Sequence, residues 1–256
     1  MSLPIVIANR FAKIIGTISK GFSYIFHFVF PNKRFTIPVY SAPIRKSETV
    51  SAIPKKIWQT NFTNRVTLPV YLNYLYNRLM SLDYEYHYVS TEDRIEYFKE
   101  NASTEIYDAF MQLNDGAAQA DLWRMFVLNK EGGIYMDIDA HAVWPLSKMI
   151  RPEDKEVFLM NKEHYTNYFI ASTQENFIIQ KTIQIIVVNI QNKDIEGGVY
   201  NLTGPNTLNT AIGNDKVNYR YYRTTCIQGS FTNEYFQYID KPRGKWTHAK
   251  VEDILK

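Results

Sequence analysis

Two aspartates, Asp137 and Asp139, stand one residue apart directly after the apolar stretch 134–136. Alternate side chains of a strand point to the same side, and where the strand ends one carboxylate can bind a cation while the other binds through water or a ribose. A divalent cation neutralises the charge that a nucleotide diphosphate gains as it leaves. Many acidic pairs in loops are only solvated caps, but the preceding Gly132-Gly133 turn and buried stretch favour a metal and diphosphate site.

Asp121 and Arg124 form a second polar pair, three residues apart on a helix predicted at 116–130. The pair interrupts an otherwise apolar face of that helix. It is either an intrahelical ion pair at the edge of the core or a pair that binds the hydroxyl groups of a donor sugar, with Arg124 near the diphosphate. His141 falls on the same side as Asp139, but a lone histidine near a strand is more often structural.

Hydrophobic periodicity predicts the elements that position these residues. Strands are expected at 56–59, 85–89, 134–136, 156–160 and 168–171, and helices at 68–80, 92–100, 104–113, 116–130 and 176–192, with another opening at Gly204-Pro205. Strands and helices that alternate predict an α/β fold with a mostly parallel central sheet, which binds ligands beyond the carboxyl ends of its strands. The tail from Tyr219 onward gives no clear assignment.

The first 56 residues carry nine Lys or Arg and the single acid Glu48, a net charge of +8. Apolar residues recur at helical spacing in residues 1–30, with Arg10, Lys13 and Lys20 elsewhere on the wheel. The apolar run at 22–30 is too short to span a bilayer. We expect a basic amphipathic helix on an anionic membrane surface and no nucleic-acid partner. The alternative is a helix packed on the catalytic domain or on a second subunit.

Prolines and basic residues make 31–52 a predicted linker, so we divide the chain into a membrane-associating segment with linker, 1–52, and a catalytic domain, 53–256. The single cysteine, Cys226, can form no disulfide within the chain, which suits a reducing compartment. A cytoplasmic protein on the inner face of a bacterial membrane fits these features.

Two segments resemble a known family. They are 117–124 (AAQADLWR) and 131–139 (EGGIYMDID), and the stretch 53–60 (IPKKIWQT) resembles the opening strand of the same family. The pattern is similar to the DXD-containing sugar transferases, which include bacterial capsule and lipopolysaccharide glycosyltransferases and fungal initiating mannosyltransferases and are related to the glucosylating domain of large clostridial toxins. The likeness spans roughly 53–146, and more loosely 167–171 and 203–205.

The resemblance implies a GT-A fold, a nucleotide-sugar donor and retention at the anomeric carbon, with UDP as the donor nucleotide and Mn²⁺ preferred over Mg²⁺. It implies catalytic roles for Asp121, Arg124, Asp137 and Asp139. The donor site would consist of Ile57, Trp58, Gln59, Asp121, Arg124, Tyr135, Asp137, Ile138 and Trp246, with Trp58 at the base and Tyr135 lining the pocket.

The C-terminal segment departs from the family, whose members often carry a His-rich stretch and a Ser-Trp pair there. This chain has residues 244–248 (GKWTH) instead. Trp246 is a candidate for the equivalent position, with Lys245 or His248 at the diphosphate and His248 as a further metal ligand. An exposed terminal turn is the alternative.

Together these features predict a metal-dependent glycosyltransferase that moves a hexosyl or N-acetylhexosaminyl group, and the resemblance implies that it is a retaining enzyme. The acceptor would be a saccharide, such as a lipid-linked oligosaccharide, a lipopolysaccharide or a capsule precursor. The alternatives are a non-enzymatic membrane or carbohydrate-binding protein and another metal-dependent phosphate-transfer enzyme, and a homo-oligomer is a further arrangement to test. The sequence leaves open the base, the sugar, the linkage and the third metal ligand.

Overall fold

The computed structural model describes residues 3–241 and 250–256. A seven-stranded sheet lies at its centre, with strand order β10-β8-β9-β6-β3-β5-β2. All of these strands except β9 and β2 run in the same direction, so the predicted α/β fold with a mostly parallel sheet is confirmed. The strands are β2 (Tyr40–Ser41), β3 (Lys56–Thr60), β5 (Glu85–Val89), β6 (Gly133–Met136), β8 (Glu156–Asn161), β9 (His164–Ser172) and β10 (Tyr219–Tyr221).

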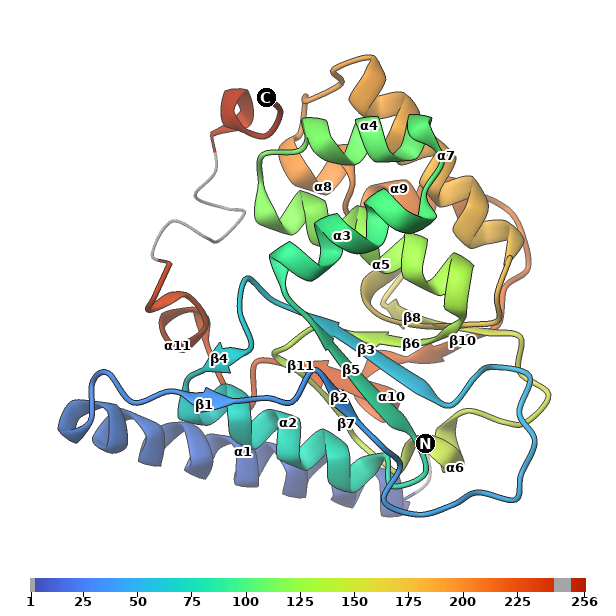
Figure 1. The fold of residues 1–256 in the computed structure, drawn as a ribbon. Coiled ribbons are helices and arrows are strands. Elements are labelled where there is room, and N and C mark those ends of the chain that lie inside the picture. Colours follow the sequence, from blue (N-terminus) through green and yellow to red (C-terminus); the bar gives the residue numbers. More distant parts are fainter. Residues whose placement is uncertain (1–2, 242–249) are drawn as a thin grey trace.

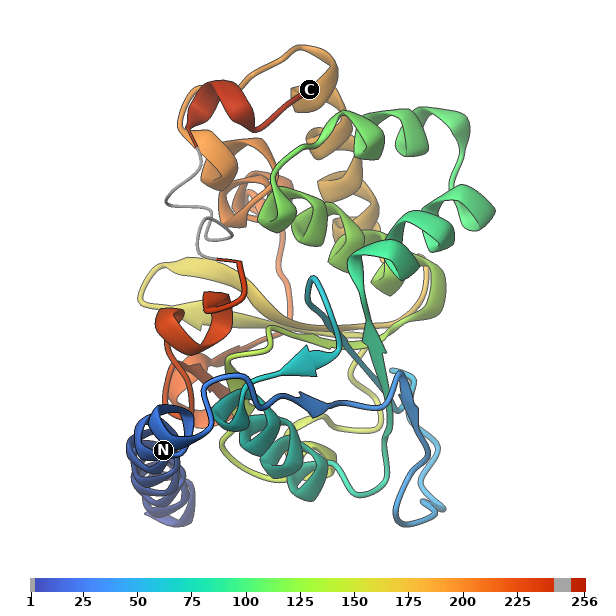
Figure 2. The same cartoon turned by 60° about the vertical axis from the view of Figure 1, so that its left-hand side comes forward.

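Helices lie on both sides of this sheet (Figures 1 and 2). One side carries α3 (Thr91–Asn101), α4 (Thr104–Gln112), α5 (Gly116–Glu131), α7 (Phe177–Gln191), α8 (Gly198–Leu202) and α9 (Pro205–Ile212). The other carries α1 (Leu3–Val29), α2 (Leu68–Met80) and α6 (Leu146–Met149). Two two-stranded sheets, β1 (Phe35–Thr36) with β4 (Arg65–Val66) and β7 (Ala140–Ala142) with β11 (Cys226–Gln228), and the short helices α10 (Tyr222–Thr225), α11 (Glu234–Tyr238) and η2 (Val251–Asp253) complete the described chain.

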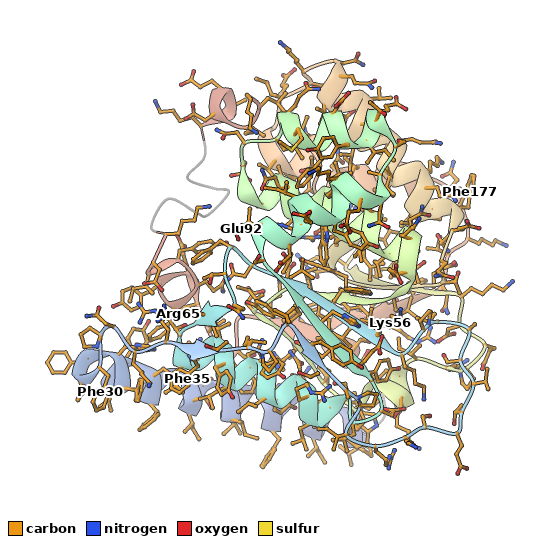
Figure 3. The ribbon with its side chains drawn as sticks, viewed as in Figure 1. Phe30, Phe35, Lys56, Arg65, Glu92 and Phe177 are labelled. Atoms are coloured by element: carbon orange, nitrogen blue, oxygen red, sulfur yellow. The ribbon has the colours of Figure 1, made fainter. Side chains whose placement is uncertain are left out.

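The central strands are apolar because both of their faces are covered. Side chains of β3 and β6 alternate between two cores: Trp58 and Tyr135 join the one under α5, and Ile57 and Ile134 join the one under α2. Figure 3 shows the direction of these strands: Lys56 lies at the start of β3, and Glu92, in the first turn of the helix that follows β5, lies toward the opposite edge of the sheet. The carboxyl ends of β3, β5 and β6 therefore meet at one edge of the sheet.

Most elements predicted from the 3.6-residue and two-residue periods are present. The structure confirms α2 and β5 with the predicted bounds, and it places the other predicted strands and helices within a few residues of their expected positions. The antiparallel β9 is longer than predicted, since it begins at His164. The C-terminal tail, which the sequence left unassigned, supplies β10, β11, α10 and α11.

Residues 31–52 are not a plain linker. They form β1 and β2, and β2 pairs antiparallel with β5 at the edge of the central sheet. Pro38 and Pro43 flank β2, and prolines are tolerated at edge strands because no neighbour needs their missing N–H groups. The boundary at residue 52 stays a prediction.

The predicted N-terminal helix is present as α1, a single helix of 27 residues. It lies along one edge of the molecule beside α2 (Figure 1). Among the helices of the described residues, none is long and apolar enough to cross a membrane.

Candidate functional site

Asp137 and Asp139 stand where β6 ends and the chain turns. The N–H of Asp137 still donates to Tyr168 of β9 at 2.9 Å, and its carbonyl accepts from the N–H of Ala140 at 3.0 Å, which closes the turn. At the start of β6, Gly133 has φ +103°, and a Cβ there would lie 2.7 Å from the carbonyl oxygen of Lys56 on β3. Only glycine allows this close pairing of β3 and β6, and it delivers the two aspartates to the carboxyl edge of the sheet.

Two amide side chains of α2 bind the backbone of this turn. Asn73 of α2 donates to the carbonyls of Ile138 and Ala140 at 2.8 and 2.9 Å. Asn77, one turn later, donates to Ala140 at 2.9 Å and accepts from the N–H of Ala142 at 3.0 Å. Both asparagines are buried, and this pairing of buried polar groups holds the turn rigidly. Sequence reasoning missed them, although two asparagines four residues apart on the apolar face of a helix were a signal.

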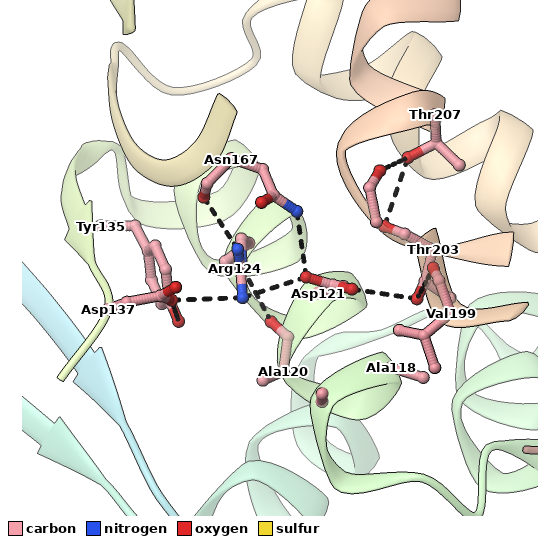
Figure 4. A network of polar contacts seen from close by, with 12 residues as sticks. Ala118, Ala120, Asp121, Arg124, Tyr135, Asp137, Asn167, Val199, Thr203 and Thr207 are labelled. Carbon is pink, nitrogen blue, oxygen red and sulfur yellow. Dashed lines mark hydrogen bonds and ion pairs between the residues drawn. The ribbon is translucent and has the colours of Figure 1, made fainter. Parts of the chain in front are cut away.

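Arg124 and Tyr135 orient the carboxylate of Asp137 (Figure 4). The Tyr135 hydroxyl donates to Oδ1 of Asp137 at 2.8 Å, and Nη2 of Arg124 lies 3.3 Å from the same oxygen. The Arg124 guanidinium lies over the Tyr135 ring, 4.5 Å from its centroid. Tyr135 is 1% exposed, so its role is to position Asp137 rather than to line an open pocket.

Asp121 anchors Arg124 from the other side. Its Oδ1 lies 3.0 Å from Nη2 of Arg124 and accepts from Asn167 at 3.0 Å, while its Oδ2 accepts from the Thr203 hydroxyl at 3.1 Å. Arg124 also donates to the carbonyl of Asn167 at 2.8 Å. Burial raises the pKa of Asp121 to about 7, although Arg124 acts in the opposite direction. The predicted pair is therefore more than an intrahelical ion pair: it joins α5 to β9 and to the end of α8.

Two glutamines that the sequence did not indicate reach the aspartates from the C-terminal segment. The amide nitrogen of Gln228 lies 3.1 Å from Oδ2 of Asp137 and 3.1 Å from Oδ1 of Asp139. Gln237 donates to the second oxygen of Asp139 at 3.4 Å. Burial, together with the charge of Asp137, raises the pKa of Asp139 to about 6. The two carboxylates thus converge on one point. Because the Gln228 amide that contacts both is uncharged, their mutual repulsion is not compensated.

These residues fit a hard divalent cation. The shared nitrogen of Gln228 marks a position where one positive group can contact both carboxylates, and a glutamine that turns its oxygen inward becomes a further oxygen ligand. Within residues 3–241 and 250–256, no cluster of three His, Cys, Asp or Glu is placed to hold a metal, so the remaining ligands would be amides, water or donor phosphate. Asp137 and Asp139 are the residues that would hold it.

The other predicted site residues lie around this point with different roles. Trp58 is 7% exposed, stacks on His87 with centroids 4.3 Å apart and donates to the carbonyl of Gly132 at 2.9 Å, so its ring is largely occupied by the core. Gln59 is buried and donates to the carbonyl of Asp137 at 3.1 Å.

The side chains of Ile57 and Ile138 pack into the core under α2 and do not reach the carboxylates. Ile57 alternates with Trp58 along β3, which turns it to the opposite face, whereas Ile138 lies in the turn between the two aspartates. That Ile57 and Ile138 contact the donor stays a prediction.

His141 does not reach the aspartates either. It is fully buried, with its ring against those of Tyr76 and Phe231. Burial lowers its pKa to about 4, so it is neutral. The structural interpretation of this histidine therefore fits. Lys245, Trp246 and His248 lie outside the described residues.

Arg94, in the first turns of α3, is a buried cation without a carboxylate partner among the described residues. It is 2% exposed, its Nη2 donates to the Thr91 hydroxyl at 2.9 Å, and its Nε has no partner. Burial lowers its pKa to about 10, and the positive charge of Arg124 acts in the same direction. Because Thr91 opens α3 directly after β5, the contact holds the guanidinium at the carboxyl edge of the sheet, on the same side as Arg124.

Comparisons with known proteins agree with this geometry. Residues 69–158, from α2 to β8, match the family described as the glycosyltransferase sugar-binding region containing DXD motif. A protein named Toxin from Photorhabdus asymbiotica is 32% identical over 122 residues, which cover 44% of this chain and only 4% of the toxin.

Among solved structures, the PaToxG glycosyltransferase matches with a TM-score of 0.53 and 20% identity, over 83% of this chain and 79% of that one. A ligand-free glycosyltransferase domain of the YGT toxin matches with a TM-score of 0.41 and 14% identity, over 58% and 54%. The GT-A fold expected from the resemblance is confirmed by the first of these. Residues 69–158 are therefore similar to the sugar-binding region of DXD-containing glycosyltransferases, and the chain has a fold similar to that of a toxin glycosyltransferase.

Proposed function

We propose that this protein is a metal-dependent glycosyltransferase that uses a nucleotide-diphosphate sugar. The observation that carries the proposal is the convergence of one oxygen of Asp137 and one of Asp139 on a single point, 3.1 Å from each, at the carboxyl edge of the sheet. Ligands of α/β sheets bind at this edge. A carbohydrate-binding module needs no such pair of carboxylates, so the site favours an enzyme.

A divalent cation bound there would neutralise the leaving diphosphate. The chain's own residues prepare the site for it. Arg124 and the Tyr135 hydroxyl fix the carboxylate of Asp137, and Asp121, itself held by Asn167 and Thr203, keeps Arg124 in place. Since these groups are buried, they need little reorganisation when the donor binds.

Arg94 supplies a further cation at the same edge. A buried charge without a partner is costly, and a protein that keeps one commonly has an anion or an acceptor for it. We assign the acceptor-rich nucleotide of the donor to this position. The assignment rests on the burial of Arg94, on its side-chain contact with Thr91 at the start of α3 and on its place near the positive charge of Arg124.

The finer assignments are carried over from the sequence. They are UDP as the donor nucleotide, Mn²⁺ before Mg²⁺, a hexosyl or N-acetylhexosaminyl group, retention of configuration, and a saccharide or lipid-linked saccharide acceptor at the inner face of a bacterial membrane. The likeness to a Photorhabdus toxin favours a second candidate, the transferase part of a toxin-type protein, in which the acceptor is different.

Calorimetric titration of UDP, GDP and their sugars tests the donor site. We expect one nucleotide family to bind in Mn²⁺, with binding lost in EDTA and weakened at least roughly tenfold in Asp139→Asn, which removes one charged ligand. Asp215→Asn is the matched control, because this carboxylate is 53% exposed and its ion-pair partner is Lys181 of α7. If no nucleotide binds, the transferase proposal fails; if a nucleotide binds but no sugar transfers to any acceptor, another phosphate-transfer enzyme becomes the better interpretation.

The acceptor is tested with radiolabelled donor and a bacterial membrane extract. Label in the lipid fraction supports a lipid-linked saccharide, and label in polysaccharide supports a capsule or lipopolysaccharide precursor. Label in neither fraction leaves the toxin-type candidate. Asp139→Asn serves as the negative control in each case.

A further inference from the structure

The outward face of α1 is a continuous apolar stripe. Nine large apolar side chains along it are each at least 56% exposed: Leu3, Ile7, Phe11, Ile14, Ile18, Phe22, Ile25, Phe28 and Val29. They recur every three or four residues, so they share one side of the helix over its whole length. Figure 3 shows side chains of α1 projecting away from the body of the protein, as far as Phe30 just beyond its end. An exposed apolar surface of this extent marks a binding surface.

The opposite face of α1 is the one that packs on the protein, and it consists of small or polar residues. Its buried members are Asn9, Ala12, Gly16, Ser23 and His27. With about 100° of turn per residue, Asn9 and His27 lie half a turn from Ile18. The helix therefore docks through its less apolar face and presents its more apolar face to the surroundings.

Specific contacts hold α1 in this orientation. The Asn9 amide donates to the carbonyl of Arg223, and Nζ of Lys20 donates to the carbonyl of Gly229 at 3.0 Å. The ring of His27 accepts from the N–H of Leu68 at 3.0 Å. At Gly16 a Cβ would lie 2.8 Å from the backbone of Ser230, so a larger residue would collide there. The helix cannot roll to bury its stripe without breaking these contacts.

The charges of α1 select the occupant of the stripe. Residues 3–29 contain three basic residues and no aspartate or glutamate. Arg10 and Lys13 are exposed, whereas Lys20 is bound to the carbonyl of Gly229. Two copies packed stripe to stripe would bring only like charges together along their edges. An anionic lipid surface instead offers acyl chains to the stripe and phosphates to the exposed Arg10 and Lys13.

We infer that α1 binds an anionic membrane surface with its axis in the plane of the bilayer and its apolar stripe in the interface. Membrane binding by α1 does not depend on the proposed function, but its consequence for the active site does. That consequence arises because α1 also contacts the C-terminal segment that carries Gln228 and Gln237. Gly16 contacts Ser230, and Lys20 binds Gly229, the neighbour of Gln228. The same helix therefore joins the membrane contact to the aspartates and fixes the orientation of the site relative to the lipid.

Vesicle flotation with the full chain tests this inference. We expect binding to phosphatidylcholine vesicles that contain phosphatidylglycerol, weaker binding without it, and weaker binding at high salt. The double variant Ile18→Glu/Ile25→Glu should bind at least roughly tenfold less, because it places two charges in the interface. Both side chains point outward, so folding should not change. Val188→Glu is the matched control: it is a half-exposed apolar residue on α7, on the other side of the sheet (Figure 1).

Two outcomes would overturn the inference. One is the absence of binding to anionic vesicles by the unaltered chain. The other is a dimer in light scattering that the double variant converts to a monomer, since a second copy would then cover the stripe. Asp139→Asn should bind vesicles as the unaltered chain does, so loss of donor binding and loss of membrane binding are separate results.

Discussion

Replacing Arg94 by methionine should make the nucleotide-free protein more stable. Methionine is similar in length and carries no charge, and Arg94 has no carboxylate partner within the described residues. Burial lowers the pKa of its guanidinium by more than two units, to about 10. One pKa unit corresponds to about 1.4 kcal/mol, so the charged form costs the folded state roughly 3 kcal/mol.

The sign follows from the direction of the shift. A base whose pKa is lowered on folding is penalised while it is charged in both states, so the full penalty applies below pH 10 and diminishes only as the pH rises above 10. Loss of the hydrogen bond to Thr91 offsets about 1 kcal/mol. The net gain in unfolding free energy is roughly 2 kcal/mol, which raises Tm by roughly 4 to 8 °C in a chain of this size.

Thermal unfolding by circular dichroism at neutral pH measures the effect. Lys99→Met on the exposed side of α3 is the matched control, with an expected change of no more than about 0.5 kcal/mol. The same variants are then titrated with UDP and Mn²⁺. We expect Arg94→Met to lose much of the nucleotide affinity while Lys99→Met keeps it. A fall in Tm for Arg94→Met would mean that this arginine is a structural cation, and unchanged nucleotide affinity would separate it from the donor site.

Three further predictions follow from the site. Because the pKa of Asp139 is raised to about 6, protons compete with the metal below that pH, and titrations should show metal-dependent donor affinity falling about tenfold per pH unit below pH 6. Gly133→Ala should lower the free energy of unfolding in urea by roughly 1–3 kcal/mol, since the residue has positive φ and a Cβ would meet the carbonyl of Lys56. Gly21→Ala, on α1 with nothing within 4 Å of a Cβ, should raise it by about 0.5–1 kcal/mol. Asn77→Ala leaves the N–H of Ala142 in β7 without its partner, while the carbonyl of Ala140 keeps Asn73, so the variant should destabilise by about 1–3 kcal/mol, with a matching loss of donor binding. Full binding would show that the turn holds without Asn77.

Local sequence signals were sufficient to predict the elements that carry Asp121, Arg124 and the two aspartates. The period of apolar residues predicted α2 and β5 with their bounds, and Asp115 and Gly132 cap α5 at the ends that the sequence indicated. The aspartates follow a buried strand, as expected. These features depend on neighbours within one or two turns, which is why the sequence predicts them.

The rest of the site depends on contacts between distant segments. Gln228 lies 91 positions after Asp137 in the sequence, and nothing in its own surroundings indicates where it binds. The segment 219–241 forms only short strands and helices, whose pairing with β8 and β7 has no strong period. Arg94 is hidden for another reason: its helix is mostly polar, so an arginine there looks like one of many exposed charges until the packing of α3 shows it to be buried.

The N-terminal helix shows what a periodic pattern can and cannot establish. An apolar stripe normally predicts the face that a helix buries against its own protein. Here the buried face carries Gly16, which allows the closest approach to Ser230, and Asn9 and His27, which provide directional hydrogen bonds. Shape and hydrogen bonding thus decide how α1 docks, and the stripe stays available for a surface outside the molecule. The position of the glycine opposite the stripe was the one sequence feature that could have revealed this, because a small residue at regular helical spacing from polar ones indicates a close helix contact.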